Sequence, residues 1–263
     1  MKTLFEIKDL PLSQFEDLGL YTDQQLLLGP DEIHALLNGR RTDLISLREL
    51  KGDGFTIQRL DARLSLQRAD SGELELMIHP IYKQAKAHSM LSYTEMEDLI
   101  EGRKDFIGKR IEKEEGRWAM FNIEYDPITR DCVGYDVSNV EAPELINGML
   151  LSEQEKSAFR RGETIELSDG TRVQHRGSEP KGLRSDRKEL ILSVLLDGGI
   201  SYLLIRGIRS LSGEKDQKNH RTPAFNNALK EMEGMKSHAQ HTMSPAHLSE
   251  LVQRKVSRSS AFQ

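Results

Sequence analysis

The segment from Arg172 to Lys188 holds the residues whose types and spacing could do the most distinctive chemistry. Its basic candidates for binding are Arg172, Arg176, Lys181, Arg184, Arg187 and Lys188, with His175 among them. Arginine and lysine bind phosphate groups because their charge releases condensed counterions, and they can equally meet an acidic protein surface. Gly177, Pro180 and Gly182 indicate a loop. The pattern predicts either a solvated surface loop or a basic finger, without the interleaved aromatics that stack on single-stranded bases.

Motifs for enzymatic chemistry are missing from the sequence. It has no phosphate-cradling Gly-x-x-x-x-Gly-Lys-Ser/Thr loop, no nucleophile elbow, no His-Glu-x-x-His helix and no strand-led Gly-x-Gly-x-x-Gly. Carboxylates are plentiful, but most of them lie beside Lys or Arg on polar helix faces, which indicates solvated charge. We therefore expect no enzyme, no catalytic residue and no cofactor.

Histidine and cysteine give little support for a metal site. His220, His238, His241 and His247 gather near the C-terminus, in the segment with the weakest signals of order. A metal site needs three or four convergent ligands oriented by further hydrogen bonds, so no metal is predicted. Cys132 is the only cysteine, which excludes an internal disulfide. It is expected to be a half-buried thiol in a strand.

Composition is typical of a soluble globular protein. Of the 263 residues, 37% are apolar and 30% are charged, and the formal net charge is −5. This charge gives no general attraction to nucleic acid or to anionic membranes, so any such binding must come from a local patch. No apolar stretch is long enough to span a bilayer, and the first residues do not resemble a secretory signal. We expect a cytoplasmic protein without a membrane partner, and its oligomeric state stays open.

Three segments share one pattern, a short helix that ends at a glycine and leads into a strand. The glycines are Gly39, Gly102 and Gly162. At such a position a helix ends in a left-handed residue, which only glycine adopts without strain. Capping boxes of Thr94 with Glu97 and of Ser152 with Glu155 indicate two of the helix starts. The pattern predicts three diverged repeats.

Alternating apolar residues predict a hairpin in each repeat. The expected strand pairs are 55–68 with 74–78, 118–123 with 133–137, and 190–196 with 200–205. The last pair is almost wholly apolar, so both strands should be central and covered on both faces. The predicted fold class is α+β: antiparallel β-hairpins, each preceded by a short helix, followed by a helical and flexible C-terminal tail.

This organisation divides the chain into four parts. They are an N-terminal unit with the first repeat at 1–90, a second repeat at 91–149, a third at 150–211, and the tail at 212–263. Two amphipathic helices are expected in the tail, each beginning at a capping residue followed by proline. Their apolar faces could dock in a groove of a partner protein through Phe225, Leu229, Met232, Leu248, Leu251 and Val252.

The sequence from Phe5 to Leu20, followed by Leu36-Leu-Asn-Gly-Arg-Arg-Thr-Asp-Leu-Ile45, resembles a Bacteroidota family of uncharacterised domains typical of conjugative elements and other mobile DNA. From Tyr93 to Ile208 the chain is similar to a companion repeat family, in which a helix ends in Gly-Arg or Gly-Lys and strands follow. That family is sometimes fused to topoisomerase-like proteins. The resemblance covers residues 4 to 208 and carries no catalytic residues. It implies an accessory protein of a mobile element.

Two main hypotheses follow. The first is a non-enzymatic mobile-element accessory protein that binds a protein partner, as an adaptor, inhibitor or immunity-like factor. The alternative is a nucleic-acid-binding accessory factor for DNA processing, which would use the basic loop at 172–188, although the acidic net charge counts against it. A metal-assisted enzyme built on His238 and His241 is a third and weaker hypothesis.

Overall fold

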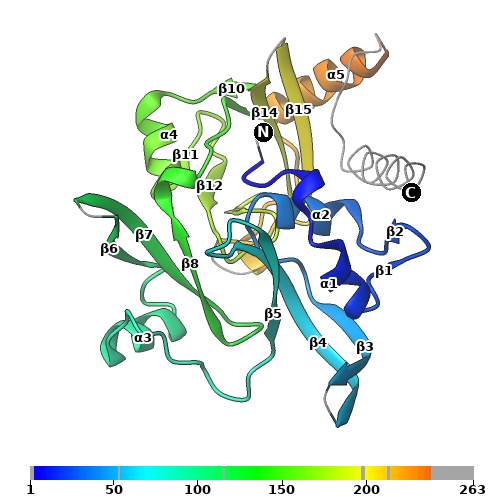
Figure 1. Ribbon diagram of the computed structural model, residues 1–263. Helices are drawn as coiled ribbons and strands as arrows, with labels where there is room; N and C mark the ends of the chain where they lie inside the picture. The colour runs from blue at the N-terminus through cyan, green and yellow to red at the C-terminus, as the bar shows by residue number, and fades with distance from the viewer. Residues whose placement is uncertain (1–2, 53, 115, 197–198, 212–213, 238–263) are drawn as a thin grey trace. The chain divides into compact units, whose positions relative to one another are not determined.

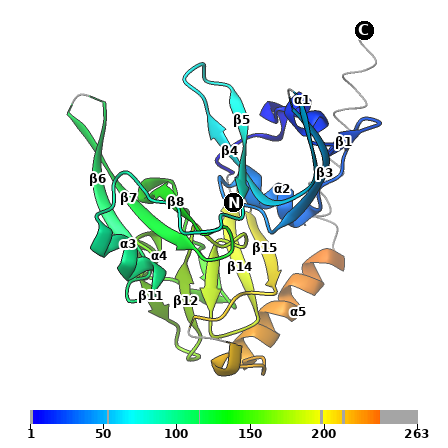
Figure 2. The same ribbon diagram turned by 90° about the horizontal axis from the view of Figure 1, so that it is seen from below.

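The computed structural model describes residues 3–52, 54–114, 116–196, 199–211 and 214–237 (Figures 1 and 2). The described chain forms two compact units. Unit 1 contains residues 101–124 and the chain from 133 onward to 237, and unit 2 contains residues 3–100 and 125–132. Short helices and antiparallel strands in small sheets make up both units, which confirms the predicted α+β class.

Unit 2 is built from the first repeat and the segments that flank it. Its elements are η1 (Ile7–Asp9), α1 (Leu12–Asp17), β1 (Tyr21–Thr22), β2 (Gln25–Leu26), α2 (Pro30–Leu37), β3 (Ile45–Gly52), β4 (Phe55–Arg68), β5 (Leu74–Pro80) and α3 (Tyr93–Ile100). The predicted apolar stripe of α2 is buried at Ile33 and Leu36, and it joins one core with Leu64 of β4. The hairpin of β4 and β5 is confirmed, with Leu64 opposite Ile78.

Unit 1 holds the other sheets, and the turn end of the β7–β8 hairpin (125–132) belongs to unit 2. The elements are β6 (Ile107–Glu114), β7 (Arg117–Asp126), β8 (Asp131–Asp136), η2 (Val137–Asn139), β9 (Leu145–Ile146), β10 (Met149–Leu150), α4 (Glu153–Arg160), β11 (Thr164–Glu166), β12 (Arg172–His175), β13 (Leu183–Ser185), β14 (Glu189–Leu196), β15 (Gly199–Arg206), η3 (Glu214–Asp216) and α5 (Pro223–Ser237). The order of a helix followed by three antiparallel strands occurs at α2, α3 and α4.

The glycines that end these helices behave as predicted. Gly39, Gly102 and Gly162 have φ angles of 68°, 69° and 77°, in the left-handed region. The capping box of Ser152 with Glu155 is confirmed. The capping box predicted at Thr94 and Glu97 is wrong, because the side chains of Ser92 and Glu95 form it, two residues earlier.

The prediction of a loop from Arg172 to Lys188 is also wrong. β12 and β13 pair with each other, and β12 also pairs with β11. The side chains of Val173 and Leu183 are buried in the core of unit 1 and so pack this small sheet against it. The strands were missed because each is short and has a single apolar residue among polar ones, which gives no clear alternation.

The apolar hairpin at the end of the third repeat is confirmed as β14 and β15, which pair along their whole length. Leu190 and Leu192 face one core, while Ile191 and Tyr202 face a second core completed by α5. Where the structure describes their side chains, at 189–193 and 202–206, the strands are therefore covered on both faces, as predicted. The expected central place of β15 is wrong, because the strand order is β10-β9-β14-β15 and β15 ends it.

The first tail helix is confirmed as α5, and the Oγ1 of Thr222 accepts a hydrogen bond from the backbone NH of Phe225 at 3.1 Å. The second predicted tail helix, with Leu248, Leu251 and Val252, lies outside the described residues. Within the described part of the chain, no helix has both the length and the hydropathy needed to cross a bilayer.

Gly102 gives a test of the helix-ending role of these glycines. A Cβ added there would meet nothing within 4 Å, so a substitution would strain only the backbone. We predict that Gly102→Val lowers the free energy of unfolding by about 1–2 kcal/mol, and that Gly102→Asn costs less because asparagine tolerates the left-handed conformation. Urea denaturation followed by circular dichroism measures both. Equal losses for the two variants would contradict the left-handed assignment.

Candidate anion-binding pocket

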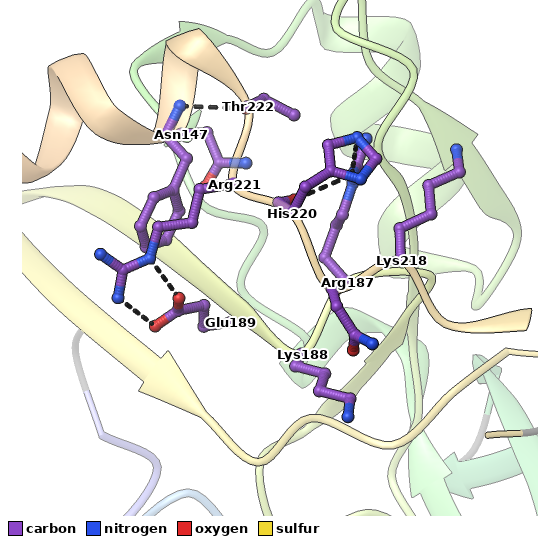
Figure 3. A pocket seen from close by; sticks show the side chains of 10 residues that line it. Asn147, Arg187, Lys188, Glu189, Lys218, His220, Arg221 and Thr222 are labelled. Carbon is purple, nitrogen blue, oxygen red and sulfur yellow. Dashed lines mark hydrogen bonds and ion pairs between the residues drawn. The ribbon is translucent and has the colours of Figure 1, made fainter. Parts of the chain in front are cut away.

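A pocket in unit 1 lies where β14 and α5 begin (Figure 3). It encloses about 300 Å³ of empty space that includes open solvent. The residues that line it come from the β9–β10 turn, the start of β14, and the segment that leads into α5. They are Asn147, Arg187, Lys188, Glu189, Lys218, Asn219, His220, Arg221, Thr222 and Phe225.

The packing of α5 places the positive end of its helix dipole at this pocket. Phe225, in the first turn of the helix, is almost completely buried against the sheet of β14 and β15. Thr222 lines the pocket and caps the helix. Pro223 has no NH group and the NH of Phe225 is bonded to Thr222, but the dipole at a helix N-terminus favours negative charge nearby, so this wall of the pocket attracts anions.

A second wall is held by Gln217, whose side chain is buried. Its amide nitrogen donates to the carbonyl oxygens of Arg187 at 3.1 Å and of Ile208 at 2.8 Å. The backbone NH of Lys218 donates to the carbonyl oxygen of Asp186 at 2.7 Å. These bonds fix the chain at 217–218 alongside 186–187, so Lys218 and Arg187 come from neighbouring strand-like segments.

Asn147 forms a third wall and shows a signal that sequence reasoning missed. Asn147 and Gly148 have φ angles of 52° and 76° and form the turn between β9 and β10. Asn-Gly is a strong hairpin signal for this reason. The backbone NH of Asn147 donates to the Ile191 carbonyl at 2.7 Å, and its Oδ1 accepts from the Ile191 NH at 3.1 Å. Asn147 therefore fixes the wall to β14.

Two of the cations in the pocket are neutralised by the chain itself. Nζ of Lys218 lies 2.9 Å from Oδ2 of Asp186. The guanidinium of Arg221 binds both oxygens of Glu189, at 2.5 and 3.3 Å, and lies over the ring of Phe225. These pairs hold the walls in place and leave little charge free for a ligand.

Arg187 differs from these cations. It is only 6% exposed, and its Nη1 reaches Nε2 and the carbonyl oxygen of His220, each at 3.1 Å. Its Nε is buried without a hydrogen-bond partner, and among the described residues Arg187 forms no ion pair with a carboxylate. A buried guanidinium without a counterion is costly, and an anion that enters the pocket would remove that cost.

The electrostatic effect of Arg187 reaches Asp169, a residue outside the pocket lining. Burial acts to raise the pKa of Asp169, but hydrogen bonds from Thr222 and Thr171, with the charge of Arg187, lower it overall. Lys188 is exposed, and it also forms no ion pair within the part of the chain that the structure describes. Figure 3 shows its side chain pointing away from the guanidinium of Arg187.

The other basic residues predicted to bind a partner lie outside the pocket. Arg176 is buried and pairs with Asp105 at 3.1 Å and with Glu124 at 3.4 Å. Arg184 pairs with Glu179 at 2.7 Å. Arg172 is exposed on β12, and Lys181 is half-buried in the β12–β13 turn. The structure thus brings together only Arg187 and Lys188 of the six.

Glu124 explains why the segment around Arg176 is not a free finger. This buried carboxylate accepts hydrogen bonds from the hydroxyl of Tyr135 at 2.9 Å and from the backbone NH groups of Gly177 and Ser178 at 3.2 and 2.9 Å. Burial, together with the charge of Glu124, strongly raises the pKa of the Tyr135 hydroxyl. The residues of the predicted finger are therefore anchored to β7.

The predicted docking face of the tail is covered by the chain itself. Phe225 and Met232 are buried in the core formed with Ile191 and Tyr202, and Leu229 packs against the edge of that core. The sequence correctly predicted the apolar stripe of α5, but the strands β14 and β15 of the same chain cover this stripe. His238, His241 and His247 lie outside the described residues.

Unit 2 contains a second polar cluster that sequence reasoning missed. Oγ of Ser65 lies 2.8 Å from Nε2 of His79, and Nδ1 of His79 lies 3.8 Å from Oδ2 of Asp131. The order of groups is that of a hydrolase triad, but the second distance is too long for a hydrogen bond. The same Oδ2 accepts instead from Arg41 at 3.0 Å. We assign this cluster to the stability of unit 2.

Buried ion pairs complete that cluster. Arg41 also donates to Oγ1 of Thr129 at 3.0 Å, and Arg63, on β4, pairs with Asp126 at 3.1 Å. Cys132 lies in strand β8 as predicted, but it is buried and not half-buried, and burial raises the pKa of its thiol to about 11. Together these contacts hold the turn 125–132 to the sheet of β3, β4 and β5.

This cluster makes the stability of unit 2 sensitive to acid. Burial lowers the pKa of His79 below 6.5. Burial acts to raise the pKa of Asp131, but the nearby imidazole of His79 and the charges of Arg41 and Lys86 lower it from 3.8 to about 2. Both pKa values are lower in the folded than in the unfolded chain, so their stabilisation is present at neutral pH and is lost as the pH falls.

We predict that the free energy of unfolding decreases as the pH falls below 6.5. His79→Gln should flatten the first part of this decrease, and Asp131→Asn should flatten the part toward low pH. Urea unfolding at a series of pH values measures the slopes. Unchanged slopes in both variants would show that these groups do not couple folding to protonation.

Comparison with known proteins gives one match. Residues 5–90 match a family described as "Protein of unknown function (DUF4099)". No curated protein and no solved structure matches the chain. The family match lies within unit 2 and does not include the pocket.

Proposed function

We propose that the protein binds the phosphate backbone of nucleic acid through the pocket of unit 1, as a non-enzymatic accessory factor for DNA processing in the cytoplasm. The observation that carries the proposal is Arg187, a buried guanidinium without a carboxylate partner in the described chain, placed beside the N-terminus of α5. Guanidinium groups and helix N-termini both bind phosphate oxygens well.

The arrangement of charges supports a backbone contact. Lys218 and Arg221 are held by carboxylates, while Arg187 and Lys188, which also line the pocket, form no ion pair among the described residues. Arg187 and Lys188 point in different directions, so each could contact a different phosphate along one nucleic-acid strand. The contact would be local, which is compatible with the net charge of −5.

The biological context of the proposal comes from the sequence. The resemblance to Bacteroidota domains of mobile DNA, and to repeats fused to topoisomerase-like proteins, supports an accessory role in a mobile element. Binding to a protein partner was the first hypothesis from the sequence. Its argument from Phe225 and Met232 is weaker now, since these side chains are buried against β14 and β15.

Removal of a positive charge from the lining of the pocket tests the proposal. Lys188→Gln should weaken binding to any nucleic-acid sequence and reduce the slope of log K against log salt by about 1. Arg187→Gln should have at least the same effect. Fluorescence anisotropy with a labelled oligonucleotide over a salt series measures both quantities.

Lys230→Gln is the matched control, because Lys230 is exposed on α5 and does not line the pocket. It makes the same change in net charge and should leave the salt slope nearly unchanged. Equal effects of Lys188→Gln and Lys230→Gln would mean that only net charge matters. The absence of salt-dependent binding in the unmodified protein would overturn the proposal.

A further inference from the structure

The hairpin of β6 and β7 is a ribbon that extends beyond its neighbouring strand. The two strands pair from Ile107 opposite Ile123 to Glu114 opposite Arg117. Strand β8 is shorter, and Figures 1 and 2 show the end of the β6–β7 ribbon projecting beyond it. A two-stranded ribbon has little stability of its own, so large apolar side chains at its end require an explanation.

One face of this ribbon exposes two such side chains. Trp118 and Met120, two residues apart on β7, point to the same face and are 50% and 49% exposed. Trp118 is the only tryptophan of the chain. Tryptophan supplies a large contact area at interfaces, and contiguous exposed apolar side chains mark interaction sites.

Arg110 adds a charge to this face. It lies opposite Met120 on β6, and its guanidinium carbon is 4.8 Å from the centre of the Trp118 ring. Arg110 forms no ion pair with a carboxylate among the described residues. Glu112, opposite Trp118, accepts a hydrogen bond from the backbone NH of Gly116 at 2.8 Å and so serves the turn of the ribbon.

The opposite face of the ribbon is used by unit 1 itself. Lys113 lies 5.4 Å from the centre of the Phe121 ring and pairs with Asp136 of β8 at 2.5 Å. The exposed face therefore carries Arg110, Glu112, Trp118 and Met120, and we call it the ribbon face.

We infer that the ribbon face stacks on unpaired bases of single-stranded nucleic acid. This inference rests on the proposed phosphate binding and names the form of nucleic acid that is bound. Bases stack on aromatic rings and on arginine guanidinium planes, and the positive charge of Arg110 complements the adjacent phosphates. In a duplex the faces of the bases are already stacked on each other, so the ribbon face selects single strands.

The pocket and the ribbon face supply different contacts. The only aromatic ring in the lining of the pocket, besides the imidazole of His220, is Phe225, which is buried beneath Arg221. His220 is already engaged by the guanidinium of Arg187, so the pocket is better suited to holding phosphates than to stacking on bases. The basic segment at 172–188 lacks aromatic residues that stack on bases, and the ribbon face provides such a contact through Trp118.

The intrinsic fluorescence of Trp118 provides the test, since the whole tryptophan signal comes from the ribbon face. Titration with oligothymidylate should quench and shift the emission, and a duplex of the same length should change it little. By anisotropy, Trp118→Ala should weaken single-strand binding by about 5- to 150-fold, the range measured for loss of one stacked base. Trp118→Phe should retain most of the affinity.

Tyr93→Ala is the control for loss of an exposed aromatic side chain, because Tyr93 lies in unit 2. It should leave the affinity unchanged. Binding that depends on Lys188 but not on Trp118, or that is equal for the duplex and the single strand, would overturn the inference and leave the proposed function intact. If no nucleic acid binds in a salt-dependent way, both fail.

Discussion

The packing of α5 on β14 and β15 is the contact on which the pocket depends. Phe225 and Met232 fill one face of the hairpin, whose other face is already covered by the core of unit 1. Full burial of such side chains stabilises by about 1.5–3 kcal/mol each. Because Phe225 lies in the first turn of α5, its burial fixes the N-terminus of the helix beside Arg187. The anion-attracting wall is thus a consequence of hydrophobic packing.

Ion pairing separates structural cations from cations that remain for a ligand. Arg176, Arg184, Lys218 and Arg221 each have a carboxylate partner, and each holds one segment to another. Arg41 and Arg63 do the same in unit 2. A buried charge is normally paired in this way. Among the buried arginines that the structure describes, Arg41, Arg63 and Arg176 pair with carboxylates, whereas the guanidinium of Arg187 contacts the imidazole and carbonyl of His220.

Local patterns in the sequence predicted the helices and the long hairpins. The glycines after α2, α3 and α4, the stripe of Ile33 and Leu36, and the Asp-Gly-Gly turn of β14 and β15 each depend on neighbouring residues, so the sequence suffices. The strands β12 and β13 were missed because their own residues show no strand pattern. They are strands because they pair in one sheet with β11, and this pairing depends on the whole fold.

The candidate site was predictable only in part for the same reason. Arg187 and Lys188 were found from composition, but nothing near them distinguishes them from Arg176 and Arg184. The distinction arises from Asp105, Glu124 and Glu179, which are set by the fold. His220 and Thr222 join the pocket from more than 30 residues away in the chain.

The central claim is that phosphate enters the pocket beside Arg187. Amide chemical-shift mapping on isotopically labelled protein, titrated with a short single-stranded oligonucleotide, tests it most directly. We expect shifts at Arg187, Lys188 and the residues from Lys218 to Phe225, with a second group around Trp118. Binding that shifts amides elsewhere and leaves those of Arg187 and the start of α5 unchanged would contradict the account.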